Sequence, residues 1–531
     1  MRQQQLTGKS NRKLFIPLML TAVFICMCIA MYILNPVYEE MEQIYFYDLN
    51  GNRMTGEYIQ GTKGEGAILV ADKGQDMTYY LNMAQALHKQ GYSVMIYDLP
   101  GQGRSQGAYS TSFYEDNSSA MQVYSAMLAF SQLCKLPPAN IHYIGHGYGA
   151  RAILQACSVD YIDPVSITLI NPEISFKSSV LAKLPVIADD TKLEWVKNLG
   201  TNISGMNIHI ISNPAKFDTC KQLSSILSTN NNTTLDKDLI LIEPFAPLSK
   251  NIINSTVSYL CSLSSFTYQP NLTIIMIYNT MLVAMLVFIF LIVWSFLSSL
   301  RYKDKSLGEY KNELSLNFYL YKLMFWVPAA VLGAIGFAIG FLIPIGYPVQ
   351  AALISFGFGA YGIVMLFIYV YSNFASDAGA GMFKDEQRTN WIGGILCFIA
   401  LFVMLKMFGH FSLYYMFPFG QRWVWFILFS AASSITFLII DREYAVLNAD
   451  RKSKVKIVLV VLLPFILASI LLLIMGIAIL AMTLIIAALS IFLTILFGRI
   501  LQALDTQIIV AAGLQGIILT MLLLSFGIAI A

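Results

Sequence analysis

The sequence predicts two structural parts, an α/β domain with a parallel sheet and an all-α domain that crosses a membrane several times. Two observations indicate this division. The chain of 531 residues is 56% hydrophobic and 12% charged, with a mean hydropathy of +0.62, which is too apolar for one water-soluble domain. A polar and varied stretch, residues 35–270, separates one apolar run from several later ones. We therefore expect a multi-pass membrane protein that carries a water-exposed domain.

The N-terminal apolar run is expected to be a membrane anchor. It extends from Leu14 to Leu34, which is long enough to cross a bilayer, and four Lys and Arg residues precede it. It is longer than the apolar core of a typical signal peptide, and no small-x-small cleavage site follows it. We expect a short cytoplasmic segment at 1–13 and an uncleaved transmembrane helix at 14–34.

Eight further spans, each of about 20 residues, are expected in the all-α domain at 271–531. The longest apolar run, Ile457–Phe497, is expected to form a hairpin of two spans that turns near Gly476. With the N-terminal anchor this gives nine spans. The predicted later spans are Thr273–Leu297, Leu323–Ile345, Val349–Tyr371, Trp391–Phe408, Trp423–Ile440, the two within Ile457–Phe497, and Ile508–Ile530.

The distribution of Lys and Arg predicts the orientation, because every second loop between the predicted spans is basic. The N-terminus is therefore expected in the cytoplasm, with residues 35–270 and the C-terminus on the extracytoplasmic side of the cell membrane. Residues 35–270 contain 15 Lys and Arg against 21 Asp and Glu. This acidic balance argues against a nucleic-acid partner. The predicted spans make the lipid bilayer the expected partner.

Strand and helix patterns alternate along residues 35–270, which predicts a parallel α/β sheet preceded by a hairpin at Asn50-Gly51. In such sheets chemistry is carried by loops beyond the carboxyl ends of the strands. The predicted strands are Gly66–Ala71, Ser93–Tyr97, Ile141–Ile144, Val165–Ile170, Asn207–Ile211 and Leu239–Ile242. The predicted helices are Thr78–Gln90, Ser112–Cys134, Tyr148–Cys157, Thr219–Leu227 and Lys250–Cys261.

One motif in this domain points to a specific chemistry. Gly145-His146-Gly147-Tyr148-Gly149 fits the G-x-S-x-G elbow of serine hydrolases, with a glycine where the serine should stand. The nucleophile of such an elbow has a positive φ, which costs a non-glycine residue about 1–3 kcal/mol and is readily adopted by glycine. A hydrogen cannot attack a carbonyl carbon, so Gly147 is predicted to mark the position of a missing nucleophile.

The segment Gly91–Gly107, which reads G-Y-S-V-M-I-Y-D-L-P-G-Q-G-R-S-Q-G, resembles a stretch of the α/β-hydrolase superfamily, together with the elbow downstream of it. The resemblance is nearest to the lysophospholipase and serine aminopeptidase-like members and covers about residues 42–265. It implies an α/β-hydrolase-like fold with a cap insertion at 171–205. It also implies a catalytic acid, for which Asp218 has a plausible position, and a base histidine within 243–249, where no histidine stands.

Two further residues of the resemblance have alternative interpretations. Asp98 either forms a carboxylate pair with Asp218 for acid/base catalysis or caps the loop that follows Asp98. We favour the capping role. His146 either acts as a ligand or general base beside Gly147, or makes hydrogen bonds that are shielded from solvent. We favour the second interpretation. The oxyanion or binding region is expected at Lys73, Gly74, Asp98, His146 and Tyr148, although the usual His-Gly pair is replaced by Asp72-Lys73-Gly74.

The function we expect is that of a catalytically inactive α/β-hydrolase-like protein of the cell envelope, which binds a lipid-like or peptide ligand or a membrane-protein partner. One alternative is an active membrane-bound esterase, lipase or peptidase with a non-standard nucleophile such as Ser105 or Ser212. Another is a transporter or lipid-handling bundle to which the domain is an accessory. No cofactor is expected, and the seven cysteines lack metal-ligand spacing, so no metal site is expected.

Overall fold

The computed structural model describes the backbone of residues 2–34, 41–73, 75–107, 118–174, 199–238, 243–264, 273–299, 316–340, 342, 347–375, 390–412, 422–446, 451–475, 478–524 and 529–530. The chain divides into two compact units. One comprises Asn35–Ile277 with Gly527–Ala531, and the other comprises Met1–Leu34 with Tyr278–Phe526. The first is an α/β unit and the second is helical, so the predicted fold class is confirmed.

The α/β unit is built on an eight-stranded sheet in the order β1-β2-β4-β3-β5-β6-β7-β8. The β1–β2 and β2–β4 pairs are antiparallel, and all other neighbouring pairs are parallel. The parallel strands therefore present their carboxyl ends at one edge, where the elbow follows β5. The strands are β1 (Glu42–Tyr47), β2 (Arg53–Ile59), β3 (Gly66–Val70), β4 (Ser93–Tyr97), β5 (Ile141–His146), β6 (Ser166–Ile170), β7 (Asn207–Ser212) and β8 (Asn232–Lys237).

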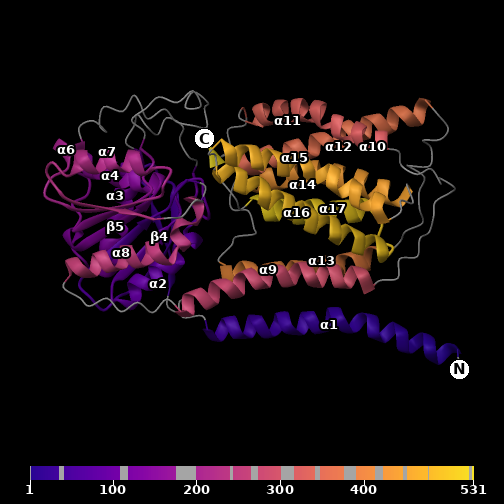
Figure 1. Ribbon diagram of the computed structural model, residues 1–531, viewed down its shortest axis with the longest axis horizontal. Coiled ribbons are helices and arrows are strands. Elements are labelled where there is room, and N and C mark those ends of the chain that lie inside the picture. Colours follow the sequence, from indigo (N-terminus) through magenta and orange to yellow (C-terminus); the bar gives the residue numbers. More distant parts are fainter. Residues whose placement is uncertain are drawn as a thin grey trace. The chain divides into compact units, whose positions relative to one another are not determined.

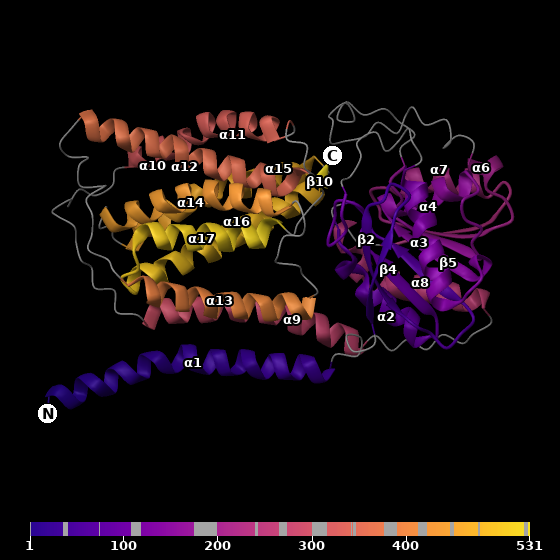
Figure 2. The same ribbon diagram turned by 180° about the vertical axis from the view of Figure 1, so that it is seen from behind.

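Helices cover both faces of this sheet (Figures 1 and 2). Helices α3, α4, α6 and α7 lie on one face, and α2 and α8 contact each other on the opposite face. This gives the three layers that an α/β domain needs to bury a parallel sheet. The bounds are η1 (Met77–Tyr80), α2 (Leu81–Lys89), α3 (Ser118–Cys134), η2 (Pro138–Asn140), α4 (Tyr148–Ser158), α6 (Leu199–Asn202), α7 (Phe217–Leu227), η5 (Glu243–Leu248) and α8 (Lys250–Leu263).

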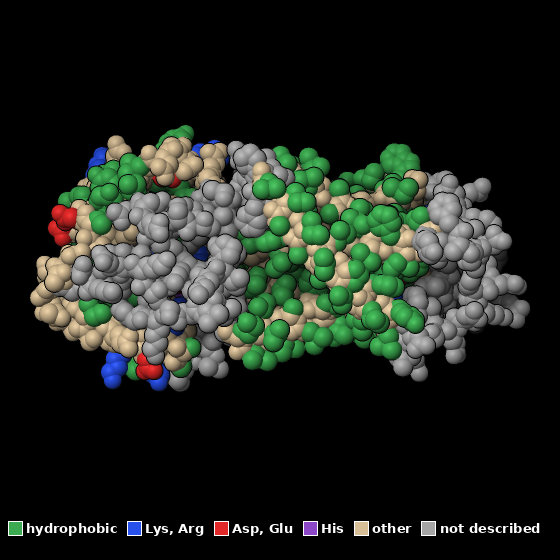
Figure 3. Space-filling view, turned by 90° about the horizontal axis from the view of Figure 1, so that it is seen from above, with side chains coloured by type: hydrophobic (Ala, Val, Ile, Leu, Met, Phe, Trp, Pro, Cys, Tyr) green, Lys and Arg blue, Asp and Glu red, His purple; other side chains and the backbone are tan. Residues whose placement is uncertain are grey.

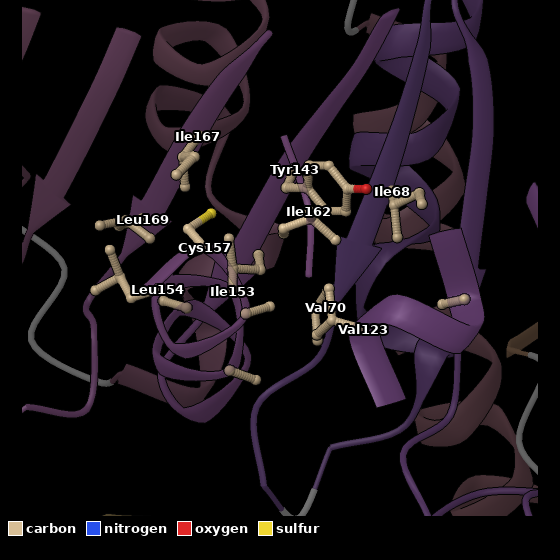
Figure 4. Close-up of a cluster of buried hydrophobic side chains, with 14 of the residues drawn as sticks. Ile68, Val70, Val123, Tyr143, Ile153, Leu154, Cys157, Ile162, Ile167 and Leu169 are labelled. Carbon is tan, nitrogen blue, oxygen red and sulfur yellow. The ribbon is translucent and has the colours of Figure 1, made fainter. Parts of the chain in front are cut away.

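The core lies between the sheet and the α3–α4 layer, and the central strands are buried along their whole length although they include polar residues such as Ser93, His142 and Thr168. Every residue of β3, β4, β5 and β6 is buried, because helices pack on both faces. Figure 4 shows side chains from three strands converging on this helix layer. The participants labelled there are Ile68, Val70, Val123, Tyr143, Ile153, Leu154, Cys157, Ile162, Ile167 and Leu169.

The edge of the sheet differs from the prediction. The eighth strand, β8, was not predicted, because its sequence Asn-Thr-Thr-Leu-Asp-Lys is polar and four of its six residues are exposed. A polar edge strand lacks the apolar pattern on which strand prediction depends. The predicted strand Leu239–Ile242 and the predicted start of a helix at 112–117 lie outside the described residues.

The helical unit contains eight helices, among the described residues, that are long and apolar enough to cross a membrane. A ninth apolar helix, α17, is shorter. On the face seen in Figure 3, hydrophobic side chains cover the described part of this unit. The helices are α1 (Arg2–Leu34), α9 (Thr273–Ser299), α10 (Leu316–Met324), α11 (Trp326–Gly340), α12 (Val349–Ala375), α13 (Trp391–Ser412), α14 (Arg422–Val446), α15 (Arg451–Ile474), α16 (Ala478–Ala503) and α17 (Ile508–Leu524), with two-residue strands β9 (Tyr347–Pro348) and β10 (Ala529–Ile530).

The helix boundaries refine the predicted spans in two places. The run Ile457–Phe497 forms two helices, α15 and α16, as expected of a hairpin, and Gly476 lies outside the described residues. Helix α14 continues beyond the predicted end at Ile440 to Val446. As a result, Asp441, Arg442 and Glu443 are buried helical residues rather than loop residues. The orientation of the spans and their exact number stay predictions.

Candidate functional site

The predicted elbow has the strand–turn–helix geometry that the motif requires. Strand β5 ends at His146, Gly147 has φ 53° and ψ −110°, and α4 begins at Tyr148. The Gly147 N–H donates to the carbonyl of Ile170 at 2.8 Å, which holds the turn against the neighbouring strand. A Cβ on Gly149 would lie 2.2 Å from the carbonyl oxygen of Val70, so a glycine is needed where α4 approaches β3.

The carboxylate of Asp72 lies at the place where a nucleophile side chain would stand. A Cβ built on Gly147 would meet Asp72 Oδ1 at 2.2 Å and its Cγ at 2.3 Å, well inside van der Waals contact. Asp72 is the second residue after β3 and is only 3% exposed. Gly147 is therefore required here for two reasons, its positive φ and the space that Asp72 occupies.

Two backbone N–H groups hold this carboxylate. Asp72 Oδ1 accepts from Lys73 N at 2.8 Å and from Tyr148 N at 2.7 Å. In α/β hydrolases the oxyanion hole is made by the N–H of the residue after the nucleophile and an N–H from a strand–helix loop. Here the N–H after the elbow and one from the loop after β3 converge on one oxygen atom of an internal anion. The pair of donors is present, but the chain's own carboxylate occupies it.

His146 is held in a neutral, buried position beside the elbow. Its Nδ1 lies 2.8 Å from the Tyr80 hydroxyl and 3.1 Å from Gln75 Oε1, and its ring has no solvent exposure. Burial, assisted by the positive charge of Lys216, lowers the pKa of His146 to about 3. The Tyr80 hydroxyl also accepts from the Asp72 N–H at 2.9 Å, which links the histidine to the residue that fills the elbow.

A second carboxylate and two cations border the elbow. Glu173 donates its N–H to the Gly147 carbonyl at 2.9 Å and forms an ion pair with Lys73. Burial raises the pKa of Glu173, but the positive charges of Lys73 and Lys216 outweigh it and hold that pKa below its ordinary value. Lys216 reaches the same region, since its Nζ lies 3.4 Å from the carbonyl oxygen of Asn171.

The remaining residues singled out in the sequence are distributed differently. Asp98 is fully buried and accepts from Met77 N and Arg104 N, each at 2.8 Å, so it joins two loops. Asp218 lies exposed in the first turn of α7, and its assignment as a triad acid stays a prediction. Gly74 and residues 175–198 of the expected cap lie outside the described residues. Within the described residues there is no group of three His, Cys, Asp or Glu side chains that could hold a metal ion.

Sequence reasoning did not identify Asp72 and Glu173 as elbow residues. The available signal was their position, because each follows a strand adjacent to β5 and parallel strands bring their carboxyl ends together. A third missed residue, Lys216, lies in the loop between β7 and α7. Nothing in the local sequence pattern shows which of these side chains turn toward the elbow.

A comparison with known families agrees with the fold of the α/β unit. A family model described as alpha/beta hydrolase fold matches residues 73–231. No curated protein matches the chain, and no family model matches the helical bundle. Similar solved structures include an esterase of Pyrococcus furiosus, with 16% identity over 42% of this chain and 92% of that chain and a TM-score of 0.35. A putative aryl esterase from Burkholderia cenocepacia has 11% identity over 42% of this chain and all of that chain, with a TM-score of 0.34.

An α/β hydrolase from Penicillium sp. sh18 is similar at 13% identity, over 43% of this chain and 99% of that chain, with a TM-score of 0.35. The assignment of the fold rests on the family model. The resemblance predicted from the Gly91–Gly107 segment and the elbow is thereby confirmed for residues 73–231. The chain therefore combines a domain of the α/β-hydrolase fold with a set of apolar helices that could span a membrane.

Proposed function

We propose that the α/β unit is a catalytically inactive hydrolase domain, displayed on the extracytoplasmic side of the cell membrane, that acts by binding. The observation that supports this most is the position of the Asp72 carboxylate. It fills the space of a side chain at Gly147 and accepts the two N–H groups that would bind the oxyanion of a hydrolase. The ligand class we propose is a lipid-like molecule or a peptide, or else a membrane-protein partner.

Three features of the elbow oppose hydrolysis. Gly147 offers no nucleophilic atom. An oxyanion that formed at the elbow would approach the negative charge of Asp72 Oδ1, and like charges at contact distance in a buried site repel strongly. His146 cannot readily serve as a base, because a group whose pKa is about 3 holds an abstracted proton very weakly near neutral pH.

The alternative of a displaced nucleophile depends on Ser105 or Ser212. The hydroxyl of Ser105 donates to the Asp98 carbonyl at 2.6 Å and accepts from Thr55 N at 2.9 Å. The hydroxyl of Ser212 donates to the Asn213 carbonyl at 3.0 Å. Both side chains are buried and have structural hydrogen bonds, which favours inactivity.

The test is hydrolysis by the full-length protein in detergent, with short-chain p-nitrophenyl esters and aminoacyl p-nitroanilides as substrates and a fluorophosphonate probe for reactive serines. Ser105→Ala, Ser212→Ala and Asp218→Ala proteins are measured beside it. We expect neither turnover above buffer nor probe labelling in any of the four proteins. Turnover by the wild type that disappears in one of the three variants would show an active enzyme and refute the proposal.

The binding role and the location require separate measurements. Native mass spectrometry of the purified full-length protein is expected to show a co-purifying lipid or peptide, and its consistent absence would count against a small ligand. For the location, Ser225→Cys places a thiol on the exposed surface of α7. A membrane-impermeant maleimide should label this variant in intact cells more strongly than the wild type, and labelling only after lysis would contradict the proposed orientation.

A further inference from the structure

Helix α14 contacts both α12 and α17 (Figures 1 and 2). It carries buried polar side chains, among them Ser430, Ser433 and Thr436. Toward α17, a Cβ on Gly516 would lie 2.2 Å from the Ser434 hydroxyl and 2.5 Å from the Ser430 carbonyl. Toward α12, Thr436 donates to the Phe358 carbonyl at 2.5 Å. We call this α12–α14–α17 contact the polar seam.

Several polar atoms of the seam are buried and have no hydrogen-bond partner within the described part of the chain. The interior of a membrane bundle offers such groups no lipid partner, so each requires a polar neighbour or a water molecule. A series of them on both sides of α14 favours a hydrated path through the bundle. They are the hydroxyls of Ser355 on α12, of Ser430 and Ser433 on α14 and of Thr520 on α17, and the Oε1 atom of Gln515 on α17.

The seam ends at two buried carboxylates, Asp441 and Glu443, which are 1% and 0% exposed. Asp441 Oδ2 accepts from Gln515 Nε2 at 2.6 Å, so the amide whose Oε1 has no partner is the one that holds this carboxylate. Both carboxylates lie inside the apolar span Arg422–Tyr444. Ionisable residues in such positions are expensive and commonly mark proton or ion pathways.

Side chains from other helices contact these carboxylates, and one of them is a cation paired with Glu443. Lys322 of α10 forms a buried ion pair with Glu443, whose Oε1 also accepts from the Tyr369 hydroxyl at 2.6 Å. Arg499 of α16 hydrogen-bonds Gln502, and its guanidinium lies 3.5 Å from the centre of the Tyr444 ring. The Nε2 of Gln502 in turn donates to the Asp441 carbonyl at 3.3 Å. Glu443 is thus contacted by side chains of α10 and α12, and Asp441 by side chains of α16 and α17, and together we call these contacts the carboxylate network.

We propose that the helical unit conducts protons along the polar seam, with Asp441 and Glu443 as the groups that bind and release them. Positive side chains within the network disfavour a metal cation at the same place, whereas a proton needs only a carboxylate oxygen and a hydrogen-bonded path. When Glu443 takes up a proton, its attraction for Lys322 weakens. When the proton leaves to water on the other side, the ion pair forms again. No other reactant is needed.

The test uses the full-length protein in liposomes that enclose the pH dye pyranine, with a potassium gradient and valinomycin to set the membrane potential. We expect potential-driven proton flux in the wild type and a decrease of at least about tenfold in both Glu443→Gln and Asp441→Asn. Ser469→Ala is the matched control, because Ser469 is a buried hydroxyl of α15 that bonds its own helix at the Ile466 carbonyl. Its flux should equal that of the wild type.

Two results for the proton flux itself would overturn the proposal. One is a wild-type flux no greater than that of empty liposomes, and the other is an equal flux in wild type and both carboxylate variants. A sodium flux that the variants abolish, with no proton flux, would also overturn it and assign the seam to a metal cation. If a variant does not reconstitute, infrared spectra of the wild type over a pH titration decide the matter, since the proposal requires the absorption of a protonated buried carboxyl group to appear.

Discussion

Replacing Gly147 by alanine tests the central geometric claim, that Asp72 fills the position of the missing nucleophile. The new Cβ would lie 2.2 Å from Asp72 Oδ1, so the carboxylate must move away and leave the N–H groups of Lys73 and Tyr148. Each hydrogen bond to a charged group contributes about 1.5–3 kcal/mol. The positive φ of 53° adds a backbone cost of about 1–3 kcal/mol.

Gly205→Ala separates these two contributions. Gly205 has a φ of 74°, but a Cβ there would meet nothing within 4 Å, so this variant has a positive-φ cost without displacing a neighbour. We expect Gly147→Ala to lower the free energy of unfolding by at least about 3 kcal/mol more than Gly205→Ala does, which corresponds to the two lost hydrogen bonds. In an Asp72→Ala background, that difference should nearly disappear, because the carboxylate is no longer there to be displaced.

The assay is pulse proteolysis in urea of the full-length protein in detergent, in which the loss of the α/β unit is followed on gels. It compares the six proteins formed by wild type, Gly147→Ala and Gly205→Ala in the two backgrounds. If Gly147→Ala costs no more than Gly205→Ala when Asp72 is present, the carboxylate does not occupy the elbow and the reasoning is wrong.

Two further predictions concern the same unit. Asp98→Ala removes the acceptor of two buried backbone N–H groups, so it should lower the free energy of unfolding by about 2–4 kcal/mol, whereas Asp218→Ala, at an exposed position, should change it by less than about 0.5 kcal/mol in the same assay. The pKa of His146 in the folded protein, about 3, lies below the ordinary value of 6.5. Below about pH 6.5 the unfolded chain therefore binds a proton at this histidine that the folded protein does not, and the free energy of unfolding falls as the pH drops. Between pH 7 and pH 5 this histidine should account for a loss of about 2 kcal/mol, so a His146→Gln protein that loses as much stability as the wild type over that interval would contradict the assignment.

Much of the architecture could be predicted because it depends on local periodicity. Apolar runs of about 20 residues predict spans, and alternating strand and helix patterns predict a parallel sheet. Both signals are contained in short windows of sequence. The same signals failed where the structure does not follow them, at the polar edge strand β8 and at the charged end of α14, because the predicted span ended at Ile440, before Asp441 and Glu443.

The elbow glycine was identified from the sequence, but the tertiary structure decided what that glycine means. Asp72 lies 76 positions before the N–H of Tyr148 that it accepts, and Lys322 lies 121 positions before its ion-pair partner Glu443. No local period relates residues so far apart. They meet because parallel strands align their carboxyl ends and because helices pack side by side, and both depend on the whole fold. The sequence by itself determined that this elbow lacks a nucleophile, and only the fold decided that a carboxylate occupies its place.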